Sequence, residues 1–182
     1  MLYLRSGRTS ANFKNLMDGG RLDIMYQCIL TSIFKSQAHR HDVIFHAILN
    51  GPPNAPLHVQ ISGEDLRNAH IDESSWEQII RNVLHKKTHA GITIERCSLQ
   101  EIIKKKHQEG SNIFLLDSKG DYFQKSLVSN DENNLFVVGD HVGLSRNEEG
   151  FIMRYGRKLS LGREKYLAAS CIDIINYLLD SN

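Results

Sequence analysis

The sequence predicts an α/β fold in which a mostly parallel sheet is flanked by helices. Beyond Gly91 the chain alternates between short apolar runs and helix-patterned segments, which is typical of a parallel sheet with crossover helices. Residues 43–49 are almost continuously apolar, as expected for a strand that is buried on both faces. Another apolar run, at 135–138, leads directly into a glycine-bearing loop. Because we find neither an internal repeat nor a low-complexity linker, we expect residues 1–182 to form one domain.

Elements in the first half of the chain follow from apolar spacing and from turn residues. Leu22, Met25 and Ile29 recur at helical spacing, whereas all three prolines of the chain fall within 50–56 and predict a turn. Apolar and polar residues alternate over 57–62, which indicates a half-exposed strand that is antiparallel to its neighbour. We therefore expect strands at 2–4, 43–49 and 57–62, and helices from about 21 to 38 and from 72 to 84.

The second half contains one clear helix start and one unusually apolar helix. Ser98 with Glu101 fits a capping box, which predicts a helix that runs to about residue 107. The segment 164–180 predicts a helix that is apolar nearly all round, with a thin polar stripe at Ser170, Asp173, Asn176 and Asp180. Such a helix is buried on most faces, either in the core of one chain or against a second subunit. The remaining expected elements are strands at 92–94, 113–116, 135–138 and 158–161, and a short helix at 147–155.

The composition is that of an ordinary globular protein. With 22 basic and 21 acidic residues the chain has a formal net charge of +1, so no strong global field attracts nucleic acid, although basic residues cluster locally. No apolar run approaches the ~18 residues of a membrane-spanning helix, and the first five residues are too short and too soon charged for a signal peptide. Cys28, Cys97 and Cys171 are widely spaced, which argues against a disulfide framework or a zinc site. These observations predict a cytoplasmic protein without a metal.

Two glycine-bearing loops near the end of the chain form the predicted active site. The strand at 135–138 runs into Gly139, and the strand at 158–161 ends beside Gly162. In an open α/β sheet, ligands bind outside the carboxyl ends of such strands. The sequence has no GxGxxG that opens a helix after the first strand, no GxxxxGK[ST] and no GxSxG. Loops that offer backbone groups and apolar side chains instead suit an adenine ring with little phosphate charge, and S-adenosyl-L-methionine fits this description.

Several motifs occur in one order along nearly the whole chain. They are GRLD at 20–23, RHDV at 40–43, LNGPPNAP at 49–56, GEDL at 63–66, GDHVG at 139–143, LSL at 159–161, and Cys171. In this order they resemble the SPOUT class of methyltransferases, and within it the archaeal TrmY family of tRNA pseudouridine-54 N1-methyltransferases. The resemblance implies S-adenosyl-L-methionine as methyl donor and tRNA as partner. It also implies a deep trefoil knot at the C-terminus and an obligate homodimer with the cofactor site beside the interface.

The resemblance also implies which residues contact the cofactor. For the side chains of Leu116 and Cys171, plain core packing is an equally good interpretation. Gly139 and Gly162 are the glycines of the two loops, and a tight turn without a ligand is their alternative role. The complete implied set is Leu116, Gly139, Ser160, Leu161, Gly162, Arg163, Glu164 and Cys171.

The implied reaction is an in-line methyl transfer to N1 of pseudouridine, a ring nitrogen that must lose its proton. A carboxylate can accept this proton, and Asp23, with Arg21 beside it, is the first candidate. The alternative for Asp23 is a charge that suits the start of a helix. Arg40 is a further catalytic candidate. Arg40, Asp42 and His141 are candidates for substrate contacts, with a salt bridge or a hydrogen bond to the backbone as their alternatives.

Two other functions stay open at this point. A related SPOUT enzyme acts on pseudouridine in small-subunit ribosomal RNA, but that family usually has insertions for which this compact chain has little room. A non-catalytic RNA-binding assembly module that keeps the fold is the alternative from another class.

Overall fold

One sheet of seven strands organises the computed structural model, which describes residues 1–124, 126–128 and 133–181. The strands are β1 Leu2–Leu4, β4 Ile44–Leu49, β5 Leu57–Ser62, β6 Ile92–Glu95, β7 Asn112–Tyr122, β8 Asn134–Gly139 and β9 Arg157–Ser160. Their order across the sheet is β6-β5-β4-β1-β8-β7-β9, so the first strand of the chain lies at the centre. Every strand that the sequence predicts in this sheet is present; β1 and β5 have the predicted ends, and the ends of the other five are shifted.

The sheet is mostly parallel, as predicted. The four pairs from β4 to β9 are parallel, whereas β5 is antiparallel to both of its neighbours, β4 and β6. The connection of residues 50–56 is too short for a crossover and joins antiparallel neighbours, which reverses β5. Since β6 is antiparallel to β5, it points in the same direction as the other strands. β5 is therefore the one reversed strand among the seven described.

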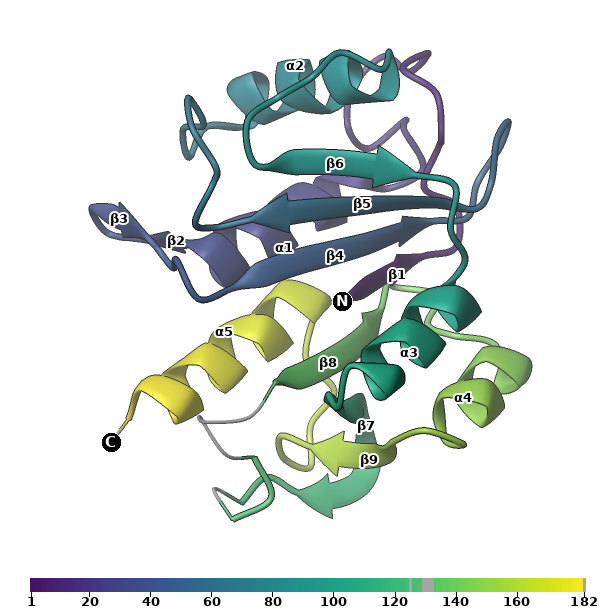
Figure 1. Cartoon of the computed structure of the whole chain (residues 1–182), viewed down its shortest axis with the longest axis vertical. Helices are drawn as coiled ribbons and strands as arrows, with labels where there is room; N and C mark the ends of the chain where they lie inside the picture. The colour runs from purple at the N-terminus through teal and green to yellow at the C-terminus, as the bar shows by residue number, and fades with distance from the viewer. Residues whose placement is uncertain (125, 129–132, 182) are drawn as a thin grey trace.

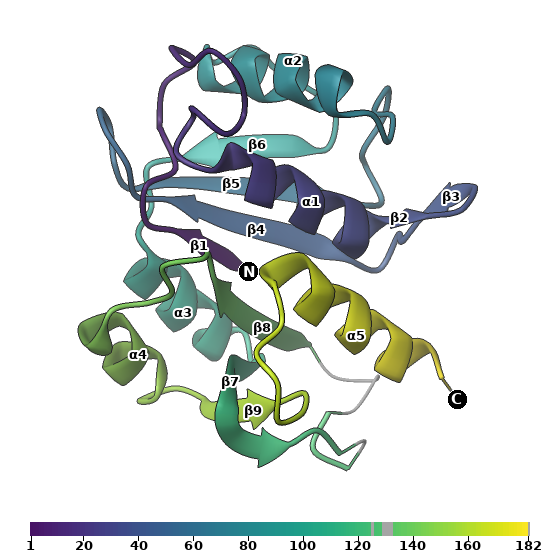
Figure 2. The same cartoon turned by 180° about the vertical axis from the view of Figure 1, so that it is seen from behind.

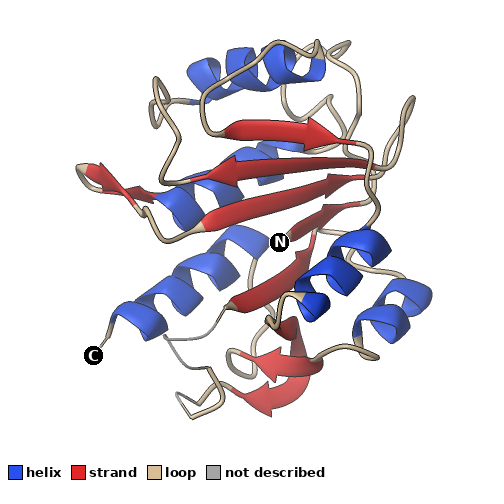
Figure 3. Cartoon of the chain, viewed as in Figure 1, coloured by secondary structure: helices blue, strands red, loops and turns tan. Residues whose placement is uncertain are grey.

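Helices cover both faces of the sheet, which Figure 3 shows as red strands between two groups of blue helices. Helices α3 (Leu99–Gln108) and α4 (Arg146–Ile152) lie on the face turned toward the viewer in Figure 1. The opposite face, seen in Figure 2, carries α1 (Leu22–Ile33), α2 (Glu73–Leu84) and α5 (Ala168–Asp180). Each face encloses its own cluster of buried apolar side chains. None of the helices described is long and apolar enough to cross a membrane.

The start of α3 follows the predicted capping box. The hydroxyl of Ser98 accepts a hydrogen bond from the backbone N–H of Glu101, and the Glu101 carboxylate accepts one from the backbone N–H of Ser98. The capping box of α4, formed by Ser145 and Glu148, has the same geometry and was not predicted. Both helices thus begin where side chains satisfy N–H groups that have no partner within the helix.

Helix α1 is shorter than the sequence predicts. It ends at Ile33 rather than near Ala38, because residues 34–39 form a hairpin of β2 (Phe34–Lys35) and β3 (Ala38–His39). The ring of Phe34 packs edge-on against His39, with centroids 4.7 Å apart, and also contacts Trp76. The backbone N–H of Arg40 donates to the carbonyl of Ile33 at 2.7 Å, which satisfies the end of the helix. Tertiary contacts therefore override the helical spacing in this segment.

Strand β7 is longer than predicted, and it bends. Its first part pairs with β9 at Phe114 to Leu116, and its last part pairs with β9 again at Asp121 and Tyr122. A Cβ at Gly120 would lie 2.6 Å from the backbone of β9, so the strand returns to β9 only because this residue has no side chain. This bend forms one wall of the site described below.

Strand β5 is covered on both faces, contrary to the predicted half-exposed strand. His58, expected on the polar side, is only 2% exposed and lies next to His46, which is 4% exposed. His58 donates from Nδ1 to the Glu95 carboxylate at 3.1 Å, so in the neutral ring its Nε2 accepts from Nδ1 of His46 at 3.0 Å. Burial lowers the pKa of His46 to about 2 and also lowers that of His58.

This histidine pair predicts loss of stability in acid. Because the folded-state pKa of His46 lies below the ~6.5 of an unfolded chain, the unfolded state takes up the proton first. The free energy of unfolding therefore falls as the pH drops below about 6.5, by about 2 kcal/mol at pH 5 for His46 alone. Urea unfolding at pH 7.5 and pH 5 measures this loss. We expect His46→Gln to reduce it and the exposed control His70→Gln to leave it unchanged. If wild type and both variants lose the same free energy of unfolding between pH 7.5 and pH 5, His46 is not the cause of the loss.

Helix α5 differs from its prediction in start and burial. It begins at Ala168 rather than at residue 164, and only Cys171 and Ile175 within it are fully buried. Two members of the predicted polar stripe face the protein: Asn176 donates to the carbonyl of Thr31, and Asp180 pairs with Arg40. Tyr177, in contrast, is 71% exposed, and Leu167 just before the helix is 74% exposed. The prediction that α5 is buried on most faces within one chain is therefore wrong.

Candidate active site

A cavity of about 250 Å³ lies beside β7, β8 and β9 and the start of α5. Six of the eight cofactor residues that the resemblance implies lie in its wall, namely Leu116, Gly139, Leu161, Gly162, Glu164 and Cys171. The complete wall consists of Leu115, Leu116, Asp117, Ser118, Val138, Gly139, Asp140, Gly143, Leu144, Glu149, Leu159, Leu161, Gly162, Glu164, Lys165, Tyr166 and Cys171. The two predicted glycine loops thus meet at one cavity.

The turn after β8 is tightly constrained. A Cβ at Gly139 would lie 2.8 Å from Cα of Gly143 and 3.0 Å from the Leu144 side chain, so the turn closes only around glycine. The buried Asp140 carboxylate holds the turn, because one oxygen accepts from the backbone N–H groups of Val142 and Gly143 at 2.9 and 3.2 Å. Its other oxygen accepts from the backbone N–H of Arg5 at 3.0 Å, which ties the turn to the end of β1.

A lysine joins two acidic residues of the wall. Lys158 on β9 pairs with Asp117 on β7, and its Nζ also lies 3.3 Å from a carboxylate oxygen of Glu149 on α4. The Lys158 ammonium lowers the pKa of Asp117, and the Asp117 carboxylate in turn raises the pKa of Lys158. These contacts fix α4 against the strands and leave the wall with more carboxylates than cations.

The loop after β9 is held by a side chain that lies behind it. Ser160 is buried; its hydroxyl accepts from the backbone N–H of Gly162 at 3.2 Å and lies 2.9 Å from the Gly162 carbonyl. Ser160 therefore positions the loop rather than lining the cavity. Arg163 is exposed and outside the wall. Cys171 closes the base of the cavity, and burial raises its pKa, so it presents a neutral thiol.

Arg21 and Asp23 form a bidentate ion pair at the start of α1. Nε of Arg21 lies 3.0 Å from Oδ1 of Asp23, and Nη2 lies 3.0 Å from Oδ2. The Asp23 carboxylate, with a smaller contribution from Asp140, raises the pKa of Arg21. Arg21 itself has a left-handed conformation, with φ 70°.

The ion pair is linked to the cavity through the segment that follows β1. A Cβ at Gly20 would overlap the carbonyl of Ser6, so the chain before Arg21 lies directly against this segment. The neighbouring residue Arg5 donates its backbone N–H to Asp140 in the cavity wall. Asp23 is thus near the site, at the carboxyl end of β1, although it is not one of the lining residues.

The remaining candidates lie elsewhere. Arg40 pairs with Asp180 at the far end of α5, which raises the pKa of the Arg40 guanidinium. Arg40 and Asp42 precede β4, at the edge of the sheet opposite the carboxyl ends of the parallel strands. Asp42 is exposed, and so is His141, which follows Asp140 in the turn without lining the cavity. The structure therefore does not bring Arg40 or Asp42 to the cavity within one chain.

Sequence reasoning missed part of the wall. Asp117 and Asp140 directly follow residues that were named, so their positions after strands were a usable signal. Glu149 reaches the wall from α4, and Lys165 and Tyr166 reach it because the last helix starts late. No sequence pattern points to these three residues.

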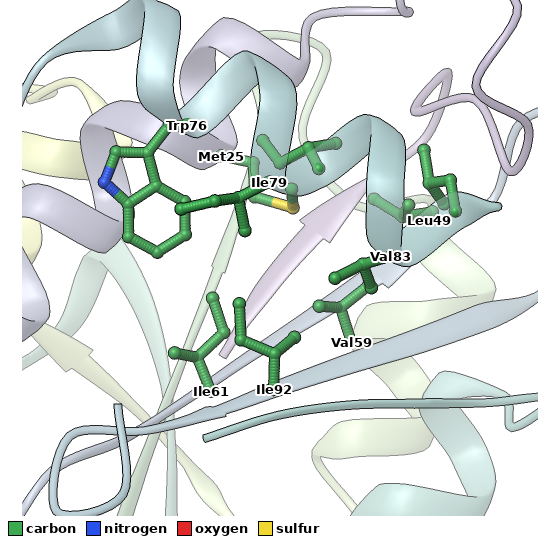
Figure 4. Close-up of a pocket in the computed structure, with 10 residues that line it drawn as sticks. Met25, Leu49, Val59, Ile61, Trp76, Ile79, Val83 and Ile92 are labelled. Atoms are coloured by element: carbon green, nitrogen blue, oxygen red, sulfur yellow. The ribbon is translucent and has the colours of Figure 1, made fainter. Parts of the chain in front are cut away.

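A second, apolar cavity lies inside the core between α2 and the sheet (Figure 4). Its volume is about 10 Å³, roughly one water molecule, and its lining includes Met25, Ile61, Trp76 and Ile92. It is a packing void and cannot hold a substrate. Within the described ranges, no three His, Cys, Asp or Glu side chains are grouped so as to hold a metal ion.

The larger cavity fits S-adenosyl-L-methionine by its chemistry. Leu116, Leu144 and Leu161 are partly exposed aliphatic side chains suited to an adenine ring. Gly139 has no side chain in the wall, so its backbone can be approached from the cavity. The sulfonium and ammonium groups of this molecule are positive, and the wall is rich in carboxylates, with Glu164 exposed at its rim.

Comparisons with known proteins agree with this architecture. The fold matches Archaeoglobus fulgidus Nep1, solved with S-adenosylhomocysteine bound, with a TM-score of 0.68 over 88% of this chain and 70% of that one, at 15% sequence identity. The fold is therefore that of the SPOUT methyltransferases. Over residues 1–182 the chain belongs to the family described as "putative SAM-dependent RNA methyltransferase".

Relatives of known name cover nearly the whole chain. A protein of Methanococcus maripaludis strain C5 is 33% identical over 97% of this chain and 96% of its own length. A protein of Methanocaldococcus jannaschii is 30% identical over 93% of this chain and 88% of its own length. Both are named tRNA (pseudouridine(54)-N(1))-methyltransferase.

Proposed function

We propose that this protein is a tRNA (pseudouridine(54)-N(1))-methyltransferase that transfers a methyl group from S-adenosyl-L-methionine to N1 of pseudouridine in the T-loop. The observation that carries the proposal is the cavity in which the loops after β8 and β9 meet. It occurs in a chain that matches relatives of that name from end to end. The match to Nep1 is a likeness of fold and does not bear on the choice of RNA substrate.

The residues of the cavity mainly bind and orient. The glycine turn held by Asp140 and the Ser160-anchored loop are rigid backbone supports for a nucleoside. When bound, S-adenosyl-L-methionine supplies an electrophilic methyl group. Correct alignment of such a group with a ring nitrogen can supply up to ~7–11 kcal/mol of a reaction barrier. The Asp23 carboxylate, oriented by two hydrogen bonds from Arg21, accepts the N1 proton of pseudouridine in this proposal.

Asp23→Ala is expected to lower kcat by about 10²–10⁴-fold, the range for loss of a general base, and to spare cofactor affinity. Single-turnover methyl transfer and calorimetry with S-adenosylhomocysteine measure the two quantities. Glu73→Ala is the matched control, because Glu73 is the acidic residue in the first turn of α2. If Asp23 only stabilises its helix, both variants turn over normally, and Asp23 has no part in the chemistry.

We further propose a homodimer, with the exposed apolar surface around α5 at its interface. Three large side chains support this interface because they are exposed: Tyr166 in the cavity wall, Leu167 just before α5, and Tyr177 in α5. A single domain of residues 1–182, a trefoil knot at the C-terminus and a cytoplasmic location belong to the same proposal. Sedimentation equilibrium tests the dimer: a mass near twice 20.7 kDa is expected, and a monomer at micromolar concentration would contradict it.

The proposed function is tested with two tRNA transcripts that differ only in pseudouridine or uridine at position 54. Each is incubated with the protein and S-adenosyl-L-methionine, digested, and analysed by mass spectrometry. We expect one methyl group on the pseudouridine transcript and none on the uridine transcript. If the protein methylates small-subunit ribosomal RNA and neither transcript, its target is pseudouridine in that ribosomal RNA instead.

A further inference from the structure

Helices α3 and α4 lie side by side (Figures 1 and 2). Two cations, one on α3 and one just after α4, lie around one aromatic ring. Nζ of Lys104 on α3 lies 5.9 Å from the ring centroid of Phe151 on α4. Cζ of Arg154, which follows α4, lies 5.8 Å from the same centroid. The charged ends of both side chains thus lie near the ring, and Lys104 and Arg154 are exposed.

Two further rings extend this cluster. Tyr155 lies 5.3 Å from Phe151 and 5.2 Å from the imidazole of His107, in both cases between centroids. Phe151 and Tyr155 are each partly exposed. We call these five residues, Lys104, His107, Phe151, Arg154 and Tyr155, the basic aromatic patch. Arg157, exposed and placed over Phe114, continues the positive charge beyond it.

Within the described part of the chain, the cations of the patch form no close ion pairs, although Lys104 interacts electrostatically with Glu101, three residues before it. Lys104, Arg154 and Arg157 make no ion pair with any described residue. Carboxylates in and directly after α3, and in α4, bind other groups: Glu101 caps α3 through Ser98, Glu109 pairs with Lys106, Glu149 pairs with Lys158, and Glu148 accepts from Tyr3 and Ser145. In a chain with a formal net charge of +1, these free cations are a local feature rather than part of a general basic surface.

The patch adjoins the proposed active site through α4. Glu149 in this helix lines the cavity, and Phe151 follows two residues later, ~3 Å along the helix axis and ~200° around it, so the two lie on different sides of α4. Because a helix is only ~10–12 Å across, an RNA strand that passes around α4 can reach the cavity within a few nucleotides.

We infer that the basic aromatic patch binds the sugar-phosphate backbone of the substrate RNA beside the methylated nucleotide, with Tyr155 as a surface on which a base stacks. Lysine and arginine bind phosphates, and partly exposed aromatic rings between them are the pattern that contacts unpaired bases. This inference rests on the proposed function for the identity of the RNA. The assignment of the patch to the RNA backbone rests on its charge, its rings and its place beside the cavity.

The test is charge reversal with a matched control. The patch variant is Lys104→Glu/Arg154→Glu. The control variant, Lys14→Glu/Lys87→Glu, makes the same change in net charge at two exposed lysines near α2, on the opposite face of the sheet. The probe is a fluorescent tRNA transcript with pseudouridine at position 54, and its affinity is measured by anisotropy between 50 and 250 mM KCl. A plot of the logarithm of the binding constant against the logarithm of the salt concentration gives the salt slope, and each phosphate contact contributes ~0.7–0.9 to it.

The patch variant is expected to bind the transcript about 10–100-fold more weakly, with a salt slope lower by about 1.5 for two lost phosphate contacts. Its affinity for S-adenosylhomocysteine stays unchanged. The control variant binds the transcript as wild type does. Equal weakening of both variants, or no weakening of the patch variant, would overturn the inference. The inference would also be overturned if polyglutamate competed with the transcript as well as RNA of the same charge does, because the patch would then bind any polyanion.

Failure of the proposed function gives a different result. If the transcript binds through the patch but is not methylated at position 54, the patch assignment stands and the tRNA target is wrong. If methylation is normal and binding ignores the patch, the function stands and the patch assignment is wrong.

Discussion

Gly139→Val is expected to abolish binding of S-adenosyl-L-methionine, with a loss of about 100-fold or more, equivalent to about 2.7 kcal/mol. The first added carbon would already lie 2.8 Å from the backbone of Gly143, and the two methyl groups beyond it enter the cavity. The turn has to open, and the contacts that a nucleoside needs are displaced. Calorimetry with S-adenosyl-L-methionine and with S-adenosylhomocysteine measures the effect.

Gly150→Ala is the control for this variant. Gly150 lies in α4, near the same cavity, but an added Cβ meets nothing within 4 Å. Replacing a helical glycine by alanine is expected to stabilise the protein by about 0.5–1 kcal/mol and to leave cofactor affinity unchanged. Normal affinity in Gly139→Val would mean that the cofactor binds elsewhere.

Trp76→Ala is expected to lower the free energy of unfolding by about 3–5 kcal/mol, a large part of the stability of a domain of this size. Trp76 is fully buried between α2 and the sheet, beside the small void shown in Figure 4. Removal of the indole enlarges a space that the surrounding strands cannot close. Urea unfolding followed by circular dichroism measures the difference.

Trp76→Phe separates packing from hydrogen bonding at this position. The indole Nε1 of Trp76 is buried without a hydrogen-bond partner among the described residues. Since an unsatisfied buried donor is destabilising by about 1–3 kcal/mol, its removal offsets most of the lost ring volume. We expect Trp76→Phe to stay within about 1 kcal/mol of wild type. A loss as large as that of the alanine variant would show that volume alone matters.

Local pattern predicted the strands well for a physical reason. A strand buried on both faces reads as an almost continuous apolar run, as in β4 with the single polar residue His46, and this signal does not depend on the rest of the fold. The ends of helices were predicted less well, because they depend on distant partners. Phe34 leaves the helical path to pack against Trp76 and His39, two residues that the spacing of α1 does not contain.

The residues of the candidate site also divide into those that the local sequence pattern predicted and those that depend on where distant helices lie. Gly139 and Gly162 were predicted because each directly follows a predicted strand, at 135–138 and 158–161, and the carboxyl ends of parallel strands share one edge. Glu149 and Tyr166 reach the cavity through the placement of α4 and the late start of α5. Arg40, which the family motif suggested for the chemistry, lies with Asp180 at the opposite edge. Within a single chain it holds α5 to the segment before β4.

A crystal of the protein grown with S-adenosylhomocysteine tests the central claim most directly. We predict that the adenine lies between Leu116 and Leu161, with the backbone of Gly139 and the loop at Gly162 within hydrogen-bonding distance of the nucleoside. A ligand bound at another place, or a cavity between β7, β8, β9 and α5 that stays empty at saturating ligand, would contradict the account.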